Sequence, residues 1–309
     1  MSKNIKKFIV RLLVFTPFSV AIYCIMICIW GDFAPYFLKK NLFFDKSSSG
    51  LLHTRLHEVR NIANVDVLVL GSSHAYRGFD PRIFKEAGFN MFNLGSSAQT
   101  PIQTEVLIDR YLDRLNPKIV LYEVYPNTFS FDGVESALNL LANDAIDLQS
   151  VKMCIKIKHI LPVNTLIYAL YRDVLNKDAG YKEKAYSGDT YIKGGFVEKT
   201  KVEFNTAKHK KAKWEFNDLQ VESFKNVLDK LKEKGVKVYL VNAPIPKDYY
   251  NSVSNNAEFD KLMQSYGTYY NFNGKVDLND SIDFYDSSHL NQTGVVKFNE
   301  KLLATIFKN

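Results

Sequence analysis

The order of apolar and polar positions indicates that strands and helices alternate over most of the chain. An apolar run at residues 65–70 predicts a strand buried on both faces, and shorter runs predict further strands at 90–94, 118–124, 236–241 and 269–272. Apolar residues at helical spacing, bounded by Pro, Gly or Asn, predict helices at 81–87, 101–115, 217–234, 257–266 and 293–307. This alternation predicts an α/β fold with a parallel sheet covered by helices on both faces.

The N-terminal part of the chain has the composition of a membrane-spanning helix. Residues 12–30 contain no charged side chain, and the run is long enough to cross a bilayer. A cleaved signal peptide is the alternative, but the run is longer than the apolar part of a typical signal peptide and ends in bulky residues. Lys3, Lys6, Lys7 and Arg11 precede it, and positive charge stays in the cytoplasm. We therefore expect a single-pass anchor in the cell membrane, with a cytoplasmic N-terminus and a periplasmic or extracellular domain.

These patterns divide the chain into three parts. Residues 1–36 form the cytoplasmic tip and the transmembrane anchor, residues 37–62 a juxtamembrane linker and helix, and residues 63–309 the α/β domain. Within that domain the alternation breaks down at about 129–214, where helical pieces interrupted by Pro162 are followed by a polar stretch. We interpret this stretch as an insertion, a lid or an acceptor-binding surface, and not as a second domain.

The formal net charge of the 309-residue chain is +7, and it is unevenly distributed. Residues 177–213 hold ten lysines and five acidic residues. An anionic envelope polymer or lipid headgroups would suit a basic segment outside the cytoplasm, whereas nucleic acid is a poor partner for an exported domain. A solvated lysine-rich loop is the simpler interpretation of the same segment.

Two short motifs, far apart in the chain, carry the side chains of nucleophilic catalysis. Ser73 directly follows the first predicted strand, after Gly71 and Ser72. Asp286 and His289 precede the last predicted helix and are three residues apart, so one helical turn would bring the carboxylate to the imidazole. A serine at the end of a buried strand, together with Asp-x-x-His, is the residue set of a serine nucleophile, its general base and an orienting acid.

Other candidates lie at the ends of the predicted strands, where ligands bind in parallel sheets. Gly95 follows the strand at 90–94, and Asn127 follows the strand at 118–124. His74, beside the serine, is either a substrate contact or a residue that packs behind the site. Glu123, at the end of its strand, either binds acceptor hydroxyls or has a structural role.

Metal chemistry is not expected from this sequence. His53 and His57 have the i, i+4 spacing of two metal ligands on a helix, but the sequence offers no third ligand near them. A solvated helix face explains the pair better, and we expect neither a metal nor a cofactor.

Taken in order, these motifs resemble the SGNH (GDSL-type) hydrolases. The resemblance rests on Gly-x-Ser after the first strand, Gly after the second, an Asn-containing turn after the third and Asp-x-x-His near the C-terminus. It covers about residues 65–307, with the insertion unmatched, and implies an SGNH-like three-layer sandwich. It also implies that Ser73 is the nucleophile, His289 the general base and Asp286 its orienting residue, and that Ser73, Gly95 and Asn127 hold the oxyanion.

The sequence departs from the usual family pattern at two places. Gly-Ser-Ser replaces Gly-Asp-Ser, which resembles the envelope branch that includes the D-alanine transfer protein of teichoic acids and the alginate and peptidoglycan O-acetylation proteins. The usual Gly-x-Asn-Asp is missing, so Asn127 is the nearest candidate for the oxyanion asparagine. If Asn127 points elsewhere, the oxyanion rests on backbone donors alone.

The chemistry that these residues imply is acyl transfer through an ester on Ser73. We expect an extracytoplasmic O-acyltransferase, or an acyl-handling partner of one, that acts on an envelope polysaccharide or polymer. The alternatives are an envelope carbohydrate esterase or deacetylase and a non-catalytic glycan-binding scaffold. The resemblance also implies a multi-spanning membrane-bound O-acyltransferase as partner, for which Ile25, Cys28 and Ile29 are a candidate packing stripe.

Overall fold

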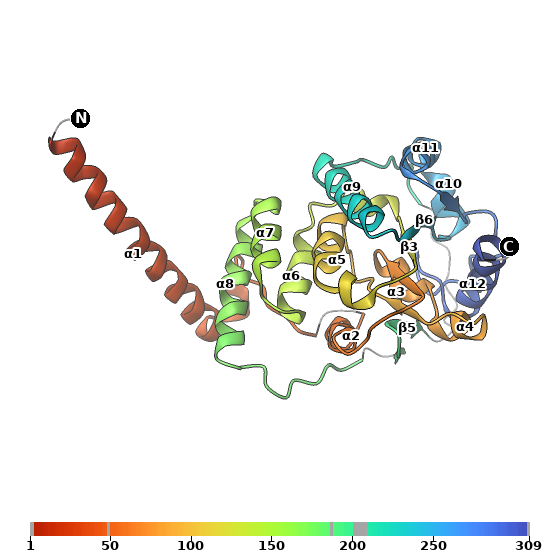
Figure 1. The fold of residues 1–309 in the computed structure, drawn as a ribbon, viewed down its shortest axis with the longest axis horizontal. Helices are drawn as coiled ribbons and strands as arrows, with labels where there is room; N and C mark the ends of the chain where they lie inside the picture. The colour runs from red at the N-terminus through yellow and green to blue at the C-terminus, as the bar shows by residue number, and fades with distance from the viewer. Residues whose placement is uncertain (1–2, 48–49, 186–187, 200–208, 308–309) are drawn as a thin grey trace.

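A sheet of parallel strands forms the centre of the protein in the computed structural model, which describes residues 3–47, 50–185, 188–199 and 209–307 (Figure 1). Among these residues the sheet has five strands in the order β2-β1-β3-β6-β7, and every neighbouring pair is parallel. The strands are β1 (Val67–Leu70), β2 (Met91–Asn93), β3 (Ile119–Glu123), β6 (Lys237–Asn242) and β7 (Tyr269–Asn271). The predicted α/β fold with a parallel sheet is therefore confirmed.

Both faces of the sheet are covered, because side chains along each strand alternate between two apolar clusters. Val67 and Val69 of β1 belong to one cluster, and Leu68 and Leu70 belong to the other. The first cluster is completed by α3 (Ser73–Gly78), α4 (Pro81–Glu86) and α12 (Gln292–Ile306). The second is completed mainly by α2 (Leu52–Val59), α5 (Pro101–Leu115), α9 (Asp218–Glu233) and α11 (Asn256–Tyr266). The result is a three-layer sandwich.

The strand order defines where a ligand would bind. The chain leaves β1 toward β2 on one side and then returns to β3 on the other side of β1. In open parallel sheets, ligands bind beyond the carboxyl ends of the strands at such a reversal. Ser73 follows the end of β1, and Glu123 is the last residue of β3. The sequence motifs therefore lie at the edge of the sheet that suits a binding site.

Helix α1 (Lys3–Phe33) projects away from the sandwich (Figure 1). It is long and apolar enough to cross a membrane, the composition of a membrane anchor or a signal sequence. Its last turns pack against α8 (Ile160–Val174), where the Tyr23 hydroxyl donates a 2.6 Å hydrogen bond to Asn164. Gly31 allows the closest approach, because a Cβ there would lie 2.2 Å from the ring of Tyr168.

The stretch that the sequence analysis interprets as an insertion contains helices and a hairpin. The helices are α6 (Val134–Asn143), α7 (Leu148–Ile157) and α8, and the hairpin strands are β4 (Asp189–Ile192) and β5 (Phe196–Lys199). Pro162 does not interrupt the helical part, contrary to the sequence prediction. The break lies at Lys158, which has a φ of 55°. Pro162 lies in the first turn of α8, where backbone N–H groups have no partner within the helix, so the N–H that proline lacks is not needed.

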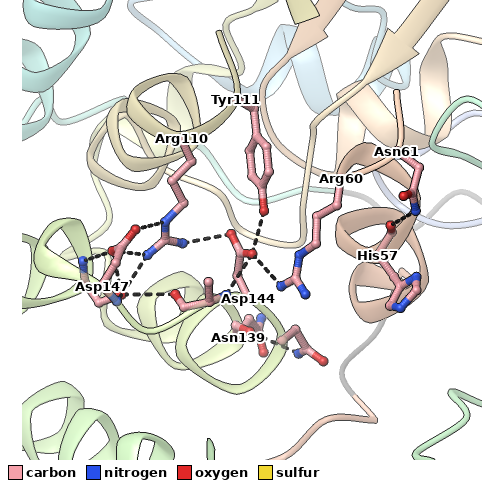
Figure 2. A network of polar contacts seen from close by, with 11 residues as sticks. His57, Arg60, Asn61, Arg110, Tyr111, Asn139, Asp144 and Asp147 are labelled. Atoms are coloured by element: carbon pink, nitrogen blue, oxygen red, sulfur yellow. Dashed lines mark hydrogen bonds and ion pairs between the residues drawn. The ribbon is translucent and has the colours of Figure 1, made fainter. Parts of the chain in front are cut away.

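An ionic network centred on the buried carboxylate of Asp144 fixes these helices to the sandwich (Figure 2). Asp144, just after α6, accepts hydrogen bonds from Tyr111 (2.6 Å), Arg110 (2.8 Å) and Arg60 (3.0 Å). The guanidinium of Arg110 also pairs with Asp147 through two bonds of 2.7 and 2.8 Å. Because Arg110 and Tyr111 belong to α5, the junction between α6 and α7 is attached directly to a helix that covers the sheet.

Two short helices and two short strands were not predicted from the sequence. They are α3, α10 (Lys247–Ser252) and the hairpin strands β4 and β5. Each is six residues long or shorter, so too few residues repeat for a helical or strand period to be visible. The hairpin contacts the core at Gly195, where a Cβ would lie 2.2 Å from the backbone oxygen of Asn93.

Candidate active site

Ser73 lies at the start of α3, on a sharp turn beyond the carboxyl end of β1. Gly71 has a φ of +136°, and a Cβ there would lie 2.7 Å from the backbone oxygen of Glu123. Ser72 is the N-cap of α3, and its hydroxyl accepts a hydrogen bond from the His74 N–H at 3.3 Å. The turn therefore carries the chain from the centre of the sheet directly into a helix whose first residue is Ser73.

The three residues of the predicted triad form one hydrogen-bonded set. The Nε2 atom of His289 lies 2.7 Å from the Oγ atom of Ser73, and Nδ1 lies 2.9 Å from Asp286 Oδ2. An ionised carboxylate only accepts hydrogen bonds, so Nδ1 of His289 carries the proton. Its Nε2 is then free to accept the Ser73 hydroxyl proton, which is the arrangement that a general base requires.

The loop before α12 holds Asp286 and His289, and it is not helical. Asp286 Oδ1 accepts the backbone N–H groups of Ser288 and His289, each at 2.8 Å. This is a side-chain-stabilised turn, so the expectation of a helical turn was wrong although the two side chains meet as predicted. A bridge between Phe284 and Leu290 closes the base of the loop.

These hydrogen bonds also set the charge of Asp286. Burial alone would raise the pKa of its carboxyl group. The hydrogen bonds from the His289 ring and from two backbone N–H groups outweigh burial and lower this pKa to about 2. Asp286 is therefore ionised at neutral pH and can stabilise a positive charge on His289.

The ring of His289 stacks against two other rings. One is Tyr285, with ring centroids 5.6 Å apart and an angle of 11° between the planes. His74 stacks against the same ring, at 4.7 Å and 26°. His74 in turn packs on Tyr125, with centroids 4.1 Å apart. The plane of the imidazole is thus fixed by packing, and its direction within that plane is fixed by Asp286.

Of the two interpretations of His74, the structure favours packing behind the site. Its exposed fraction is only 4%, and its Nε2 lies 3.0 Å from the backbone oxygen of Ser288. Burial, with the nearby His289, holds the pKa of His74 well below its ordinary value, so the ring is neutral. A direct substrate contact would require a more exposed side chain.

Glu123 likewise belongs to the interior and does not present its carboxyl group to an acceptor. It is 2% exposed, and its Oε2 accepts the N–H of Ser72 (3.1 Å) and shares a 3.0 Å hydrogen bond with the Ser72 hydroxyl. Burial raises its pKa to about 8, which the hydrogen bonds from Ser72 offset only in part. Of the two interpretations of Glu123, the structure favours the structural role.

Gly95 occupies the expected position after β2, but its N–H is already engaged. That N–H donates a 2.9 Å hydrogen bond to Asn93 Oδ1, and the amide of Asn93 donates to Ala75 of α3. A Cβ at Gly95 would lie 2.7 Å from Ala75 Cβ and 2.8 Å from the Ser72 oxygen. In this structure Gly95 permits close packing against the nucleophile helix, and its N–H is not available to an oxyanion.

The other two oxyanion candidates differ in their positions. The Ser73 N–H lies in the first turn of α3, where N–H groups have no partner within the helix. Asn127 lies in the short 3-10 helix η2 (Pro126–Phe129), and its side chain is half-buried. Within the described residues, no hydrogen bond connects the Asn127 side chain to Ser73 or to His289.

Several residues of the site were missed in the sequence. Tyr285, Tyr125, Ser72 and Asn93 all contact the triad or the residues that hold it. Each is within two residues of a predicted candidate, so proximity to the motifs was the only available signal. Among the described residues, no group of three or more His, Cys, Asp or Glu side chains is arranged to hold a metal ion.

Comparison with known proteins adds little to this geometry. No protein-family model and no curated protein matches the sequence. The solved structures it resembles include a presumed acylhydrolase from Bacteroides fragilis, with a TM-score of 0.42 and 12% identity, over 84% of this chain and 99% of that one. They also include a GDSL-like lipase from Bacteroides thetaiotaomicron, with a TM-score of 0.39 and 11% identity, over 82% and 97%. At these scores the likeness assigns no activity, so the proposals below rest on the side chains.

Proposed function

We propose that this protein transfers acyl groups through an ester on Ser73. The observation that carries the proposal is the 2.7 Å contact between Ser73 Oγ and His289 Nε2, with Asp286 bonded to the opposite ring nitrogen. The site's position beyond β1, at the reversal of strand order, supports it independently. The same observations support membership of the SGNH superfamily, to which the motifs have the resemblance described above.

In the first half-reaction, His289 Nε2 takes the proton of Ser73 as its Oγ attacks the carbonyl carbon of an acyl donor. A C–O bond forms, and the carbonyl oxygen becomes an anion that the Ser73 N–H is placed to stabilise. When this intermediate collapses, the bond to the leaving oxygen breaks and His289 returns the proton to that oxygen. Asp286 stabilises the imidazolium between these two steps, and Ser73 is left as an ester.

In the second half-reaction, an acceptor hydroxyl replaces the leaving group. Its proton passes to His289, its oxygen attacks the ester carbon, and Ser73 leaves as the alkoxide and recovers the proton. A sugar hydroxyl as acceptor makes the protein an O-acyltransferase, whereas water makes it an esterase or a deacetylase. Neither half-reaction needs a metal or a cofactor.

We propose the transferase outcome, with an envelope polysaccharide or polymer as acceptor. Its support is the projecting apolar helix α1, which would keep the domain at a membrane surface. The four basic residues before the span favour a cytoplasmic N-terminus and an exported domain. The packing of Tyr23 and Gly31 on α8 gives α1 a role in the folded protein and so favours an uncleaved anchor over a signal peptide.

We further propose that α1 docks on a multi-spanning membrane partner that supplies the acyl group. An exported domain has no cytosolic acyl donor within reach, so an activated acyl group must cross the membrane. Ile25 and Ile29 of α1 are 58% and 48% exposed, on a part of the helix that also packs on α8. On α8, Leu170 and Val174 are exposed apolar side chains as well.

Covalent labelling of the full-length protein tests the acyl-enzyme. The protein in detergent is mixed with 4-nitrophenyl acetate, quenched in acid during the initial burst, and analysed by intact-mass and peptide mass spectrometry. We expect one acetyl group, on the peptide that contains Ser73, and no acetyl group in Ser73→Ala. Ser281→Ala removes another exposed serine and is the matched control; it should label like the wild type.

The outcomes separate the candidate functions. Acetylation of Ser73→Ala to the wild-type level would contradict an acyl-enzyme on Ser73 and favour a glycan-binding scaffold. Acetylated Ser73 that passes its acyl group to added oligosaccharides faster than to water supports the transferase. Release to water alone, with every acceptor tested, favours the esterase.

A further inference from the structure

A second chain of buried polar groups lies behind the triad and was not expected from the motifs. It runs from Glu123, at the end of β3, through Ser72 to His74 on α3, and then to the backbone of Ser288. The three side chains are 2–4% exposed. The chain thus connects the centre of the sheet with the loop that carries His289.

The contacts of His74 determine where its proton lies. The backbone oxygen of Ser288 can only accept a hydrogen bond, so the Nε2 of His74, 3.0 Å away, must carry the hydrogen. Because the buried ring is neutral, its Nδ1 is an acceptor, and it faces the Ser72 hydroxyl at 3.4 Å. His74 therefore donates to the His289 loop and needs a donor from the side of Ser72.

Glu123 determines whether Ser72 can be that donor. A protonated Glu123 donates to Ser72 Oγ, and the Ser72 hydroxyl then donates to His74 Nδ1, so that every bond points toward the loop. An ionised Glu123 can only accept, so the Ser72 hydroxyl donates to Glu123 instead. His74 Nδ1 then faces a lone pair of Ser72 Oγ and has no donor. Burial raises the pKa of two neighbouring tyrosines, Tyr122 and Tyr125, and a charge on Glu123 adds to this effect. Within the described residues, no charged side chain pairs with Glu123.

We propose that His74 is a positioning residue for His289, held in its Nε2–H form by Ser72 and Glu123. The hydrogen bond from His74 to Ser288 fixes the loop, and the His74 ring stacks on the His289 ring and holds its plane. Asp286 then fixes the direction of the His289 ring within that plane through its hydrogen bond. A neutral His74 also avoids repelling the imidazolium that His289 becomes during the reaction. This inference rests on the proposed function, because it assigns His74 a role only if His289 is the base.

Substitutions of His74 separate its two contacts. His74→Phe keeps a ring against His289 but removes the donor to Ser288, whereas His74→Gln keeps an amide donor but removes the ring. Hydrolysis of 4-nitrophenyl acetate by the full-length protein in detergent is measured, and kcat is divided by the fraction of Ser73 that a fluorophosphonate labels at completion. We expect His74→Phe to lower kcat at least about tenfold with KM unchanged, because a small misplacement of the base is costly. His74→Gln should recover part of that loss.

Glu123→Gln tests the other end of the chain. Glutamine has nearly the same shape as glutamate, but it cannot ionise, so no charge develops at this position at any pH. Wild-type kcat should decline as pH rises through about 8, where Glu123 loses its proton, and Glu123→Gln should lack this decline. A variant that merely loosened the structure would lower kcat at every pH and leave the inflection in place.

The results distinguish this inference from the proposed function. If Ser73→Ala hydrolyses the ester at the wild-type rate, the proposed function itself fails. If Ser73→Ala is inactive but His74→Phe keeps the wild-type kcat per labelled site, His74 does not position the base. An unchanged inflection in Glu123→Gln overturns the part assigned to Glu123.

Discussion

Gly71 and Glu123 approach so closely that the first of these residues has no room for a side chain. A Cβ on Gly71 would lie 2.7 Å from both the backbone oxygen and the Oε2 atom of Glu123. Gly71 also has a φ of +136°, which L side chains rarely adopt. The turn that presents Ser73 at the sheet edge therefore depends on glycine for two separate reasons.

Gly71→Ala should consequently remove activity as well as stability. The added Cβ must displace either β3 or the turn, and the turn carries Ser72 and Ser73. We expect ester hydrolysis to fall at least about a hundredfold, since a displacement of about 1 Å has that effect on a reacting group. Gly88→Ala is the control, because Gly88 has a φ of +87° but no heavy atom within 4 Å of its added Cβ. Equal activity in the two variants would contradict the steric argument.

The stability of the protein should depend on pH through Glu123. Burial raises its pKa from 4.5 to about 8, so between these values the folded state holds a proton that the unfolded state has released. The stabilising contribution is complete below pH 4.5 and is lost as pH rises through about 8; its upper bound is about 5 kcal/mol. The thermal midpoint of the wild type, measured by scanning fluorimetry, should fall more between pH 6 and pH 9 than that of Glu123→Gln. Parallel falls in the two proteins would show that Glu123 is not the group responsible.

An ion pair attaches the β4–β5 hairpin to the nucleophile helix. Both nitrogens at the end of Arg77 bond to the carboxylate of Asp189 at 3.1 Å, and both side chains are buried. Asp189→Ala leaves the Arg77 charge buried without this partner, and we expect a loss of about 3 kcal/mol in the free energy of unfolding. Lys118→Ala breaks the exposed pair with Asp66 and should cost less than about 1 kcal/mol. Similar losses in chemical denaturation would argue against a structural role for the buried pair.

The sequence predicted the candidate site best where the residues that define a feature lie within one short motif. Ser73 was predictable because a glycine-serine turn follows a long apolar run, and Asp286 and His289 because they are three residues apart. The stacking of His74 on His289 was not predictable, since the two residues are more than two hundred positions apart. Nothing in a pattern of apolar and polar positions records which loops meet at a sheet edge.

Gly95 shows a different limit of prediction from sequence. A glycine after a strand either offers its N–H to a ligand or permits a close approach of backbone, and the residue type is the same in both cases. The deciding partner is Asn93, whose side chain accepts the Gly95 N–H. Asn93 lies within an apolar strand pattern, which carries no information about the partner of its polar side chain.

The orientation of the chain is tested by protease accessibility. The full-length protein is expressed in a bacterial host, and trypsin is added to intact spheroplasts. If the basic N-terminus stays inside, the many lysines of the α/β domain face the protease and the domain is digested. A cytoplasmic protein serves as the control for leakage. Protection of the domain in intact spheroplasts, with digestion after lysis, would reverse the orientation.

Docking through α1 predicts a separation between two activities. Residues 5–22, Ile25, Cys28 and Ile29 are exchanged for an unrelated transmembrane sequence, while Tyr23 and Gly31 are kept so that α8 retains its contacts. Hydrolysis of 4-nitrophenyl acetate depends only on the triad and should stay within about twofold of the wild type. Acylation of the envelope polymer, measured by ester release from purified cell envelopes, should fall below detection.

A second exchange identifies the part of α1 that matters. If only residues 5–22 are replaced, Ile25, Cys28 and Ile29 remain beside α8, where the exposed apolar surface of the two helices is continuous in our proposal. Because helices in lipid associate by close packing of particular faces, this variant should keep most of its polymer acylation if that surface is the contact. Loss of acylation in both exchanges would move the contact to the first half of the span. Full acylation in both would mean that the domain obtains its acyl group without docking through α1.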